Sequence, residues 1–312
     1  KKNNLDFYYE GNGQGLIGAI SAIGYDFSDH TLELLSYRKK RKFGKERIIS
    51  ADSVKKMQEN TFPHTFNSFD TKKSRVLIMP HGPDPVFYGV RGENVNSLVT
   101  ATKILQSNEK LDGYMIFKSN QGTGDHLKNE LNSKTMKPYA SGTLIGIVSN
   151  TPKIAKGGHV FFTVTSKNHE FWCAVYKETG ISTIASNLII GDKISVGGGV
   201  RKASKNFPRI INLEFIKIIS LEKNLSKTNP ICKKCDKKMK SKGRNQGFQC
   251  IKCGAKNLKK TTIEIPRKIK KQLYIPKISA HRHLTRPLQR TGKINKTIAF
   301  DNSQSWFCVY EK

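Results

Sequence analysis

The spacing of apolar residues changes several times within residues 1–135, and it predicts alternating helices and strands. Apolar side chains recur at helical intervals over Leu16–Ile23, after a glycine-rich turn. A second helix is expected to begin at an Asn94 cap and to run to about Ser107. Three stretches have the composition of strands: Thr31–Arg38, Arg75–Met79 and Tyr114–Lys118. We therefore expect an α/β or α+β unit in this part of the chain.

Residues 136–222 show a different pattern, in which glycines separate short apolar runs and leave room for one short helix after the third run. Five runs predict strands: Thr143–Val148, His159–Thr165, Glu170–Tyr176, Lys193–Val200 and Ile210–Ile219. Five strands with a helix after the third are typical of an OB-fold barrel. Another small barrel is the alternative, because periodicity does not fix the order of strands.

Four cysteines within residues 223–258 predict a metal site. Cys232 and Cys235 form one C-x2-C pair, and Cys250 and Cys253 form a second pair after fourteen residues. Two such pairs place four thiolates on two turns that can meet around one tetrahedral ion, for which zinc is expected. Two disulfides are the alternative, which a reducing cytosol disfavours. No open coordination position is evident, so we expect a structural zinc ribbon rather than a catalytic centre.

Basic residues far outnumber acidic ones, with 55 Lys and Arg against only 24 Asp and Glu, which gives a formal net charge of +31. This excess predicts a polyanionic partner, such as RNA, DNA or an anionic membrane. About 24 of the basic residues, against 4 acids, follow position 222, and residues 259–312 are expected to form a basic tail. A solvated, Lys-rich composition without such a partner is the alternative. There is no run of eighteen apolar residues and no signal peptide, which predicts a cytoplasmic protein that does not span a membrane. No membrane partner is expected.

Candidate RNA-binding residues follow from the predicted barrel and the basic tail. An OB barrel binds single strands through a basic groove and through aromatic side chains on which bases stack. Strand alternation exposes either Phe161 or Phe162, but not both. For any one of the barrel aromatics, a place in the core is the alternative. The candidates are Phe161, Trp172 and Arg201 in the barrel, and Arg282, His283 and Arg286 in the tail.

Two polar loops that follow predicted strands are candidates for a catalytic site. The first holds His81, Asp84 and Arg91 within a dozen residues, and three prolines stiffen it. The second, Ser119–His126, contains Asp125. If both loops lie at one edge of one sheet, Asp84 and Asp125 are placed to hold Mg²⁺, and Arg91 to meet a phosphate. Two ordinary turns are the alternative.

Several strings in this chain resemble the archaeal isoleucine-tRNA agmatidine synthetase family. They are Gly-Leu-Ile-Gly-Ala at 15–19, Asp-His-Thr-Leu-Glu-Leu-Leu-Ser-Tyr-Arg at 29–38, Pro-His-Gly-Pro-Asp-Pro-Val at 80–86, Gly-Val-Arg-Gly-Glu at 89–93, Asn-Gln-Gly-Thr at 120–123 and Arg-His-Leu-Thr-Arg-Pro-Leu at 282–288. The resemblance covers nearly the whole chain and implies a multidomain α+β protein. Its parts, in order, are an α/β catalytic-side region with partial kinase-like and ferredoxin-like parts at 1–135, an OB fold at 136–222, a zinc ribbon at 223–258 and a basic tail at 259–312.

The resemblance also implies an activity, that of an ATP-dependent ligase that modifies tRNA. The family joins agmatine to the wobble cytidine of the isoleucine tRNA with the CAU anticodon: the cytidine carbonyl oxygen is phosphorylated, and the amine of agmatine displaces the phosphate. ATP, Mg²⁺ and structural Zn²⁺ are the implied cofactors, and no obligate protein partner is implied. By motif, the catalytic candidates are His81, Asp84, Arg91 and Asp125. The candidates for binding the nucleotide or target base are Gly82, Asn120, Gln121, Gly122 and Thr123.

One difference from the family concerns the start of the chain. The family opens with a strand and loop of the type Gly-Ile-Asp-Asp-Thr-Asp, which does not occur here, so we expect a fragment with an incomplete catalytic site. A non-catalytic RNA-binding protein with an OB fold and a zinc ribbon, of the exosome-cap or translation accessory type, is the alternative function. It leaves the Pro80–Val86 and Asn120–Thr123 strings unexplained, and ATP binding would separate the two functions.

Overall fold

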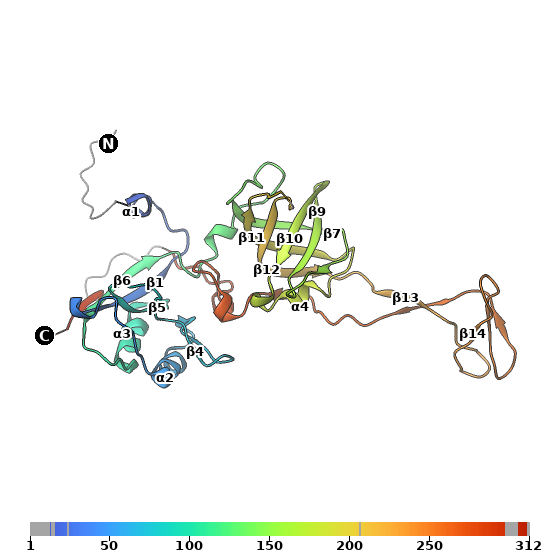
Figure 1. The fold of residues 1–312 in the computed structure, drawn as a ribbon, viewed down its shortest axis with the longest axis horizontal. Helices are drawn as coiled ribbons and strands as arrows, with labels where there is room; N and C mark the ends of the chain where they lie inside the picture. The colour runs from blue at the N-terminus through green and yellow to red at the C-terminus, as the bar shows by residue number, and fades with distance from the viewer. Residues whose placement is uncertain (1–12, 14–15, 24, 206, 297–304, 311–312) are drawn as a thin grey trace. The chain divides into compact units, whose positions relative to one another are not determined.

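The structure, a computed structural model, describes residues 13, 16–23, 25–205, 207–296 and 305–310. The chain divides into two compact units. The first consists of Lys1–Asp125 together with Arg282–Lys312, and the second consists of His126–His281. Figure 1 shows the elements of both units, and each unit is described by itself below.

An antiparallel sheet of five strands forms the centre of the first unit. The strands are β1 (Thr31–Arg38), β2 (Thr65–Phe66), β5 (Val86–Gly92), β6 (Leu111–Ser119) and β19 (Phe307–Val309). Their order across the sheet is β19-β6-β1-β5-β2, which places β1 in the middle and a strand from the C-terminal end of the chain at one edge (Figure 1). The loops that carry the candidate catalytic residues are joined directly to β5 and β6.

Two helices, α2 (Ala51–Thr61) and α3 (Val95–Ile104), pack on one face of this sheet (Figure 1). Leu32 and Leu34 of β1 are buried among the residues of that core, whereas Glu33 between them is only half-buried. This alternation is the expected consequence of a sheet with one covered face. The second face therefore remains available for polar groups such as Glu33.

The shorter elements of the first unit test the helix and strand predictions. The helix Leu16–Ile23, now α1, and the strand Thr31–Arg38 are confirmed with the predicted bounds. The Asn94 cap of α3 is also confirmed, but the helix ends at Ile104. The predicted strand Arg75–Met79 is too long, because only its first two residues pair with a neighbouring strand. The remaining elements are β3 (Phe69–Asp70), β4 (Arg75–Val76) and the 3-10 turns η1 (Lys40–Lys42) and η5 (Leu288–Arg290).

A closed five-stranded barrel forms the main part of the second unit. Its strands are β7 (Ser141–Val148), β9 (Val160–Ser166), β10 (His169–Val175), β11 (Lys193–Arg201) and β12 (Ile210–Ser220). The order is β7-β9-β10-β12-β11 and back to β7; only the β10–β12 pair is parallel. The short helix α4 (Ser182–Ala185) lies between β10 and β11 in the chain, as predicted. At Gly198 of β11, a Cβ atom would lie 1.9 Å from the Asn212 carbonyl oxygen, so only glycine fits this crossing.

The remaining residues of the second unit form a small three-stranded sheet around the four cysteines and several short pairings. The small sheet contains β14 (Lys240–Ser241), β15 (Phe248–Gln249) and β16 (Lys256–Asn257). The other elements are β8 (Lys153–Ile154), β13 (Leu225–Thr228), β17 (Thr261–Glu264), β18 (Leu273–Tyr274), η2 (Asp125–Leu127), η3 (Lys177–Thr179) and η4 (Ile278–Ala280). Among the described residues, none of the helices has the length and hydropathy needed to cross a bilayer.

The segment expected to be a basic tail takes part in both units. Its strand β18 pairs with β12 of the barrel, and its strand β19 pairs with β6 of the first sheet. The part that begins at Arg282 belongs to the first unit. The domain boundaries expected from the sequence remain a proposal. In the structure, the candidate residues of the tail belong to the same unit as the candidate loops.

Candidate functional site

The Pro80–Val86 loop is held by one arginine, Arg47, whose side chain is only 8% exposed. Its guanidinium donates hydrogen bonds of 2.7–3.3 Å to four carbonyl oxygens, those of Pro80, Gly82, Asp84 and Val86. Four acceptors around one planar guanidinium fix the course of the loop more closely than its prolines do alone. Arg47 was not predicted from the sequence, since a basic residue within a basic run carries no separate signal.

Asp84 helps to fix the backbone of this loop, and its side chain also faces solvent. Its Oδ1 accepts a hydrogen bond from the Val86 N–H at 3.0 Å and lies 3.5 Å from Nη2 of Arg47. The side chain is still 40% exposed, and the neighbouring His81 and Gly82 are exposed. The loop is therefore fixed in its backbone while its polar side chains face solvent, which suits the binding of a polar ligand.

The loop Asn120–Thr123 packs against the segment that begins at Arg282. The Gly122 N–H donates to the His283 carbonyl at 2.8 Å, and Arg286 Nε donates to the Thr123 carbonyl at 2.7 Å. Gly122 has a φ of +71°, and a Cβ atom there would lie 2.9 Å from the Phe66 ring, so a side chain is excluded. The candidates of the Asn120–Thr123 loop and those of the segment from Arg282 are far apart in the sequence, and they lie together in the structure.

The interior of this loop is organised by Thr123. Its side chain is buried, and its hydroxyl donates to the Asn120 carbonyl at 2.6 Å and accepts from the Asp125 N–H at 3.2 Å. A hydroxyl used in this way shapes the turn rather than contacts a ligand. Asp125 follows the turn at the start of η2 and is half-buried.

A buried ion group fastens the C-terminal segment to the first unit. Arg290, which is fully buried, donates through Nη2 to Asp29 Oδ1 at 3.1 Å and through Nε to Glu93 Oε1 at 2.6 Å. Its Nη1 also donates to the Gly122 carbonyl at 2.9 Å. Arg286 adds a bond of 2.8 Å to Asp29 Oδ2. None of these acidic residues was predicted, because ion pairs between distant segments leave no periodic pattern.

Four polar residues from different segments meet on the open face of the sheet, and we call them the Glu33 group. Glu33 Oε1 lies 3.2 Å from Arg91 Nε, and Glu33 Oε2 accepts from the side-chain amide of Gln121. Arg91 Nη2 in turn contacts Nδ1 of His283 at 2.8 Å; since a guanidinium only donates, this nitrogen accepts. The side chains of Glu33 and Arg91 are 15% and 21% exposed, so the group remains within reach of a ligand.

The described residues contain one cluster suited to bind a metal through three or more His, Cys, Asp or Glu side chains. It consists of Cys232, Cys235, Cys250 and Cys253, whose Sγ atoms all lie within 4.8 Å of one another. This spacing suits a single tetrahedral ion. The predicted carboxylates Asp84 and Asp125 belong to no such cluster, and their part in Mg²⁺ binding remains a prediction.

The two halves of the cysteine cluster have the same local geometry. Asp236 N–H donates to the Cys232 carbonyl at 2.8 Å, and Gly254 N–H donates to the Cys250 carbonyl at 2.9 Å. The N–H of Cys253 and then that of Lys252 donate to the Cys250 sulfur and lower the pKa of this thiol to about 6. These backbone donors thus favour the thiolate form of Cys250, the form that binds metal.

The barrel exposes an aromatic pair beside an arginine. Phe162 is fully buried while Phe161 is half-exposed, which confirms the predicted alternation. The Phe161 ring lies nearly parallel to that of Phe207, with centroids 6.5 Å apart, and the Arg201 guanidinium lies 5.4 Å from the Phe207 centroid. Phe207, which is 48% exposed, was not among the candidates. Trp172 is half-exposed on β10.

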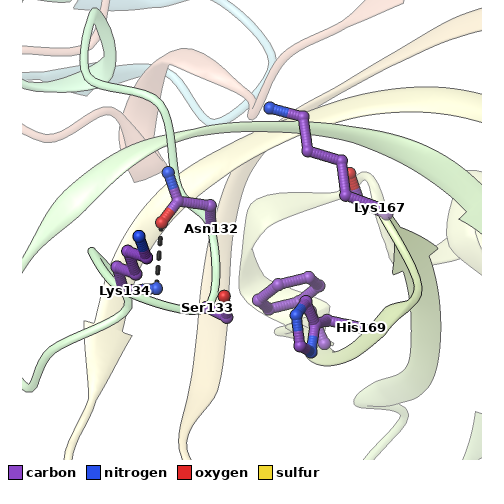
Figure 2. A pocket seen from close by; sticks show the side chains of 7 residues that line it. Asn132, Ser133, Lys134, Lys167 and His169 are labelled. Carbon is purple, nitrogen blue, oxygen red and sulfur yellow. Dashed lines mark hydrogen bonds between the residues drawn. The ribbon is translucent and has the colours of Figure 1, made fainter.

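A polar pocket of about 320 Å³ lies beside the hairpin that joins β9 and β10. Figure 2 shows Lys134, Lys167 and His169 at its rim, with a dashed bond between the Lys134 N–H and Asn132. Lys167 is already paired with Glu130 at 2.6 Å. The pocket adds positive charge to the barrel but offers no catalytic constellation.

Comparison with known proteins identifies the family of this chain. A model of the TiaS FLD domain matches residues 13–126, and a model of the TiaS C-terminal zinc ribbon domain matches residues 229–269. The isoleucine-tRNA 2-agmatinylcytidine synthetase TiaS of Cenarchaeum symbiosum is 45% identical over 97% of this chain and 68% of its own length. The chain belongs to the TiaS family. The TiaS of Methanocaldococcus jannaschii is 39% identical over 89% of this chain and 64% of its own.

Solved TiaS structures have the same fold. The crystal structure of apo TiaS matches with a TM-score of 0.79 and 35% identity, over 93% of this chain and 68% of that one. The complex of TiaS with isoleucine tRNA and ATP has the same TM-score of 0.79, with 34% identity over 94% and 68%. This chain thus spans about two thirds of the length of its TiaS relatives. The FLD match contains both candidate loops and the Glu33 group except His283, and the ribbon match contains all four cysteines.

Proposed function

We propose that this protein takes part in the ATP-dependent joining of agmatine to the cytidine of isoleucine tRNA. Its relatives are named as synthetases of 2-agmatinylcytidine, and related solved structures contain that tRNA with ATP, or with AMPCPP and agmatine. The observation that carries the proposal to this chain is the Glu33 group. It joins a sheet strand, the Asn120–Thr123 loop and the C-terminal segment at one place on the open face of the sheet.

The proposed reaction depends on positioning the reactants and neutralising phosphate charge more than on covalent catalysis by protein side chains. A phosphoryl group of ATP passes to the carbonyl oxygen of the cytidine, and the amine of agmatine then forms the new C–N bond as phosphate leaves. Such transfers are accelerated mainly by positioning and by neutralising phosphate charge. Mg²⁺ would supply part of that neutralisation, and Asp84 and Asp125 are the carboxylates we assign to hold it.

Arg91 is the residue we assign to the phosphate. Its guanidinium is held by Glu33 on one side and by His283 on another, yet it is 21% exposed. A guanidinium fixed before the substrate arrives stabilises developing charge without further reorganisation. His81, exposed on the Pro80–Val86 loop, and Gln121 are left as contacts to the nucleotide or the target base.

We further infer that the barrel is an OB fold and that it binds tRNA. In support of this, the order of its strands, the single parallel pair and the helix after the third strand agree with the OB plan. The exposed pair of Phe161 and Phe207 beside Arg201 has the composition of a base-stacking surface. Arg282, His283 and Arg286 would act from the C-terminal segment, where Arg286 mainly fixes the loop at Thr123.

The alternative, a non-catalytic RNA-binding protein, is not favoured. It accounts for the barrel and for the ribbon, in which Zn²⁺ on the four cysteines would have a structural role. It gives no reason for the FLD match over residues 13–126 or for the polar constellation around Glu33.

Binding measurements test the proposal first, before any assay of turnover. Fluorescence anisotropy with labelled isoleucine tRNA should give saturable binding, and ATP with Mg²⁺ should protect the Pro80–Val86 loop from hydrogen exchange. Glu33→Gln should abolish that protection and leave tRNA affinity within about threefold. Binding of tRNA without any effect of ATP would support the non-catalytic alternative.

A further inference from the structure

Directly after β1, the chain forms a short basic loop, Lys39–Lys45, which has no part in the groups described so far. It contains five basic residues and the exposed ring of Phe43 around one 3-10 turn. Lys40, Arg41 and Lys45 are exposed, and Lys39 and Lys42 are half-exposed. Basic residues packed this closely repel one another strongly unless an anionic partner neutralises them.

The loop is fixed at its beginning by Arg38, which is 1% exposed. Its guanidinium pairs with both oxygens of Glu109 at 2.7 and 3.1 Å and donates to the carbonyl oxygens of Lys45 and Glu46 at 2.6 and 3.0 Å. The far end of the loop is therefore bound to its start. A loop closed in this way keeps its charges close together instead of letting them spread apart.

The same loop is joined to the Pro80–Val86 loop at both ends. The Arg38 N–H donates to the Pro85 carbonyl at 2.9 Å, and Arg47 holds four carbonyl oxygens of that loop, as described above. The basic surface and the candidate catalytic loop thus form one rigid piece. Anything that binds the basic loop is positioned with respect to His81 and Asp84.

The acidic residues nearby do not neutralise this charge. Glu109 is used by Arg38, and Lys42 reaches only to 4.0 Å from its second oxygen. Glu46 is the exposed acid next to the loop. The excess positive charge on Lys39, Lys40, Arg41 and Lys45 therefore faces solvent.

We propose that the Lys39–Lys45 loop binds the phosphate backbone of the RNA substrate beside the nucleotide that is modified. The inference rests on the proposed function and deepens it: the loop supplies a contact in the first unit, separate from the barrel and the C-terminal segment. Its attachment through Arg38 and Arg47 aligns the RNA backbone with the Pro80–Val86 loop. The partner is RNA because closely spaced cations on a rigid turn match phosphates along a strand.

The test measures the salt dependence of isoleucine tRNA binding. Removing one cation that neutralises a phosphate should lower the slope of log K against log[salt] by about 0.7–0.9. The triple change Lys40→Ala, Arg41→Ala and Lys45→Ala should therefore lower the slope by about 2 and weaken binding at about 0.1 M salt at least tenfold. A matched control removes three exposed lysines elsewhere in the same unit: Lys55→Ala, Lys72→Ala and Lys73→Ala.

The outcomes separate this inference from the proposed function. An equal loss of affinity in both triple variants would reduce the effect to net charge and overturn the inference, and so would an unchanged slope in the loop variant. No tRNA binding by the unaltered protein would overturn the proposed function itself. A second measurement guards against misfolding of the triple variant. Ribonuclease footprinting on the tRNA complex of Arg47→Lys should show an altered footprint. The thermal midpoint of unfolding of this variant should stay within a few degrees of that of the unaltered protein. An unchanged footprint would contradict the alignment.

Discussion

Arg290 lies fully buried against Asp29, which precedes it by 261 positions in the chain. The same guanidinium reaches Glu93 and the Gly122 carbonyl, so one side chain ties the C-terminal segment to three parts of the first unit. The segment is therefore a structural part of the candidate site. Its removal would affect more than RNA affinity.

The first prediction follows from that buried group. Arg290→Ala should lower the free energy of unfolding by about 3–5 kcal/mol, because it leaves Glu93 without its arginine partner and leaves the buried Asp29 with only Arg286 as counter-charge. Urea denaturation followed by tryptophan fluorescence measures the change. Lys293→Ala, at an exposed position of the same segment, is the control and should change stability by less than about 0.5 kcal/mol. Equal stability of the two variants would contradict the account.

The second prediction concerns pH. Burial, and then the charge of Lys118, lower the pKa of His30 below its ordinary value of 6.5. The unfolded chain then binds a proton more readily than the folded one, so stability should fall as the pH decreases from about 7 through 6.5 towards the folded pKa. His30→Leu should reduce this loss between about pH 7.5 and 5, and the exposed His169→Gln should not. Equal pH dependence of the two variants in urea denaturation would exclude His30 as its source.

The third prediction concerns zinc. Purified protein should contain about one equivalent, and Cys250→Ser should lose it together with the fold of the ribbon, because a structural site needs all four thiolates. Metal analysis and cadmium or cobalt absorption spectra provide the measurement. Cys173→Ser, which alters a buried core thiol, is the control and should retain the metal. Less than about half an equivalent in unaltered protein would refute the site.

The fourth prediction tests the exposed aromatic pair. Phe207→Ala should weaken binding of isoleucine tRNA by about 1–3 kcal/mol if a base stacks there, and the salt slope should remain unchanged. Tyr139→Ala removes a ring that is 84% exposed and is the control. If both changes have the same effect on affinity, the pair packs only against the barrel.

The sequence allowed the barrel strands to be predicted because glycines and apolar runs are local signals. The strand Thr31–Arg38 was predictable for the same reason. The run Arg75–Met79 was misjudged: β4 covers only Arg75–Val76, and beyond it the Ile78 carbonyl accepts from Gly89 instead of continuing the β3 pairing. Apolar composition does not show over how many residues a strand pairs with its neighbour.

The candidate site was predictable in its loops but not in its supports. Arg91, Gln121 and His283 were candidates from the sequence, yet Glu33, to which Arg91 and Gln121 are bound, was not, although it lies within the string at 29–38. Nor was Arg47, whose contacts are to backbone carbonyls that no sequence pattern records. Residues that act through long-range hydrogen bonds become visible only when the fold brings their partners together.

The most direct test of the proposed function measures incorporation of labelled agmatine into transcribed isoleucine tRNA by the full-length protein, with ATP and Mg²⁺. The unaltered protein should incorporate the label only when ATP is present. Arg91→Lys should lower turnover at least about a hundredfold, the loss expected when a transition-state contact of about 3 kcal/mol is removed, and should leave tRNA affinity within about threefold. Incorporation that survives this change undiminished, or none by the unaltered protein, would contradict the proposed site.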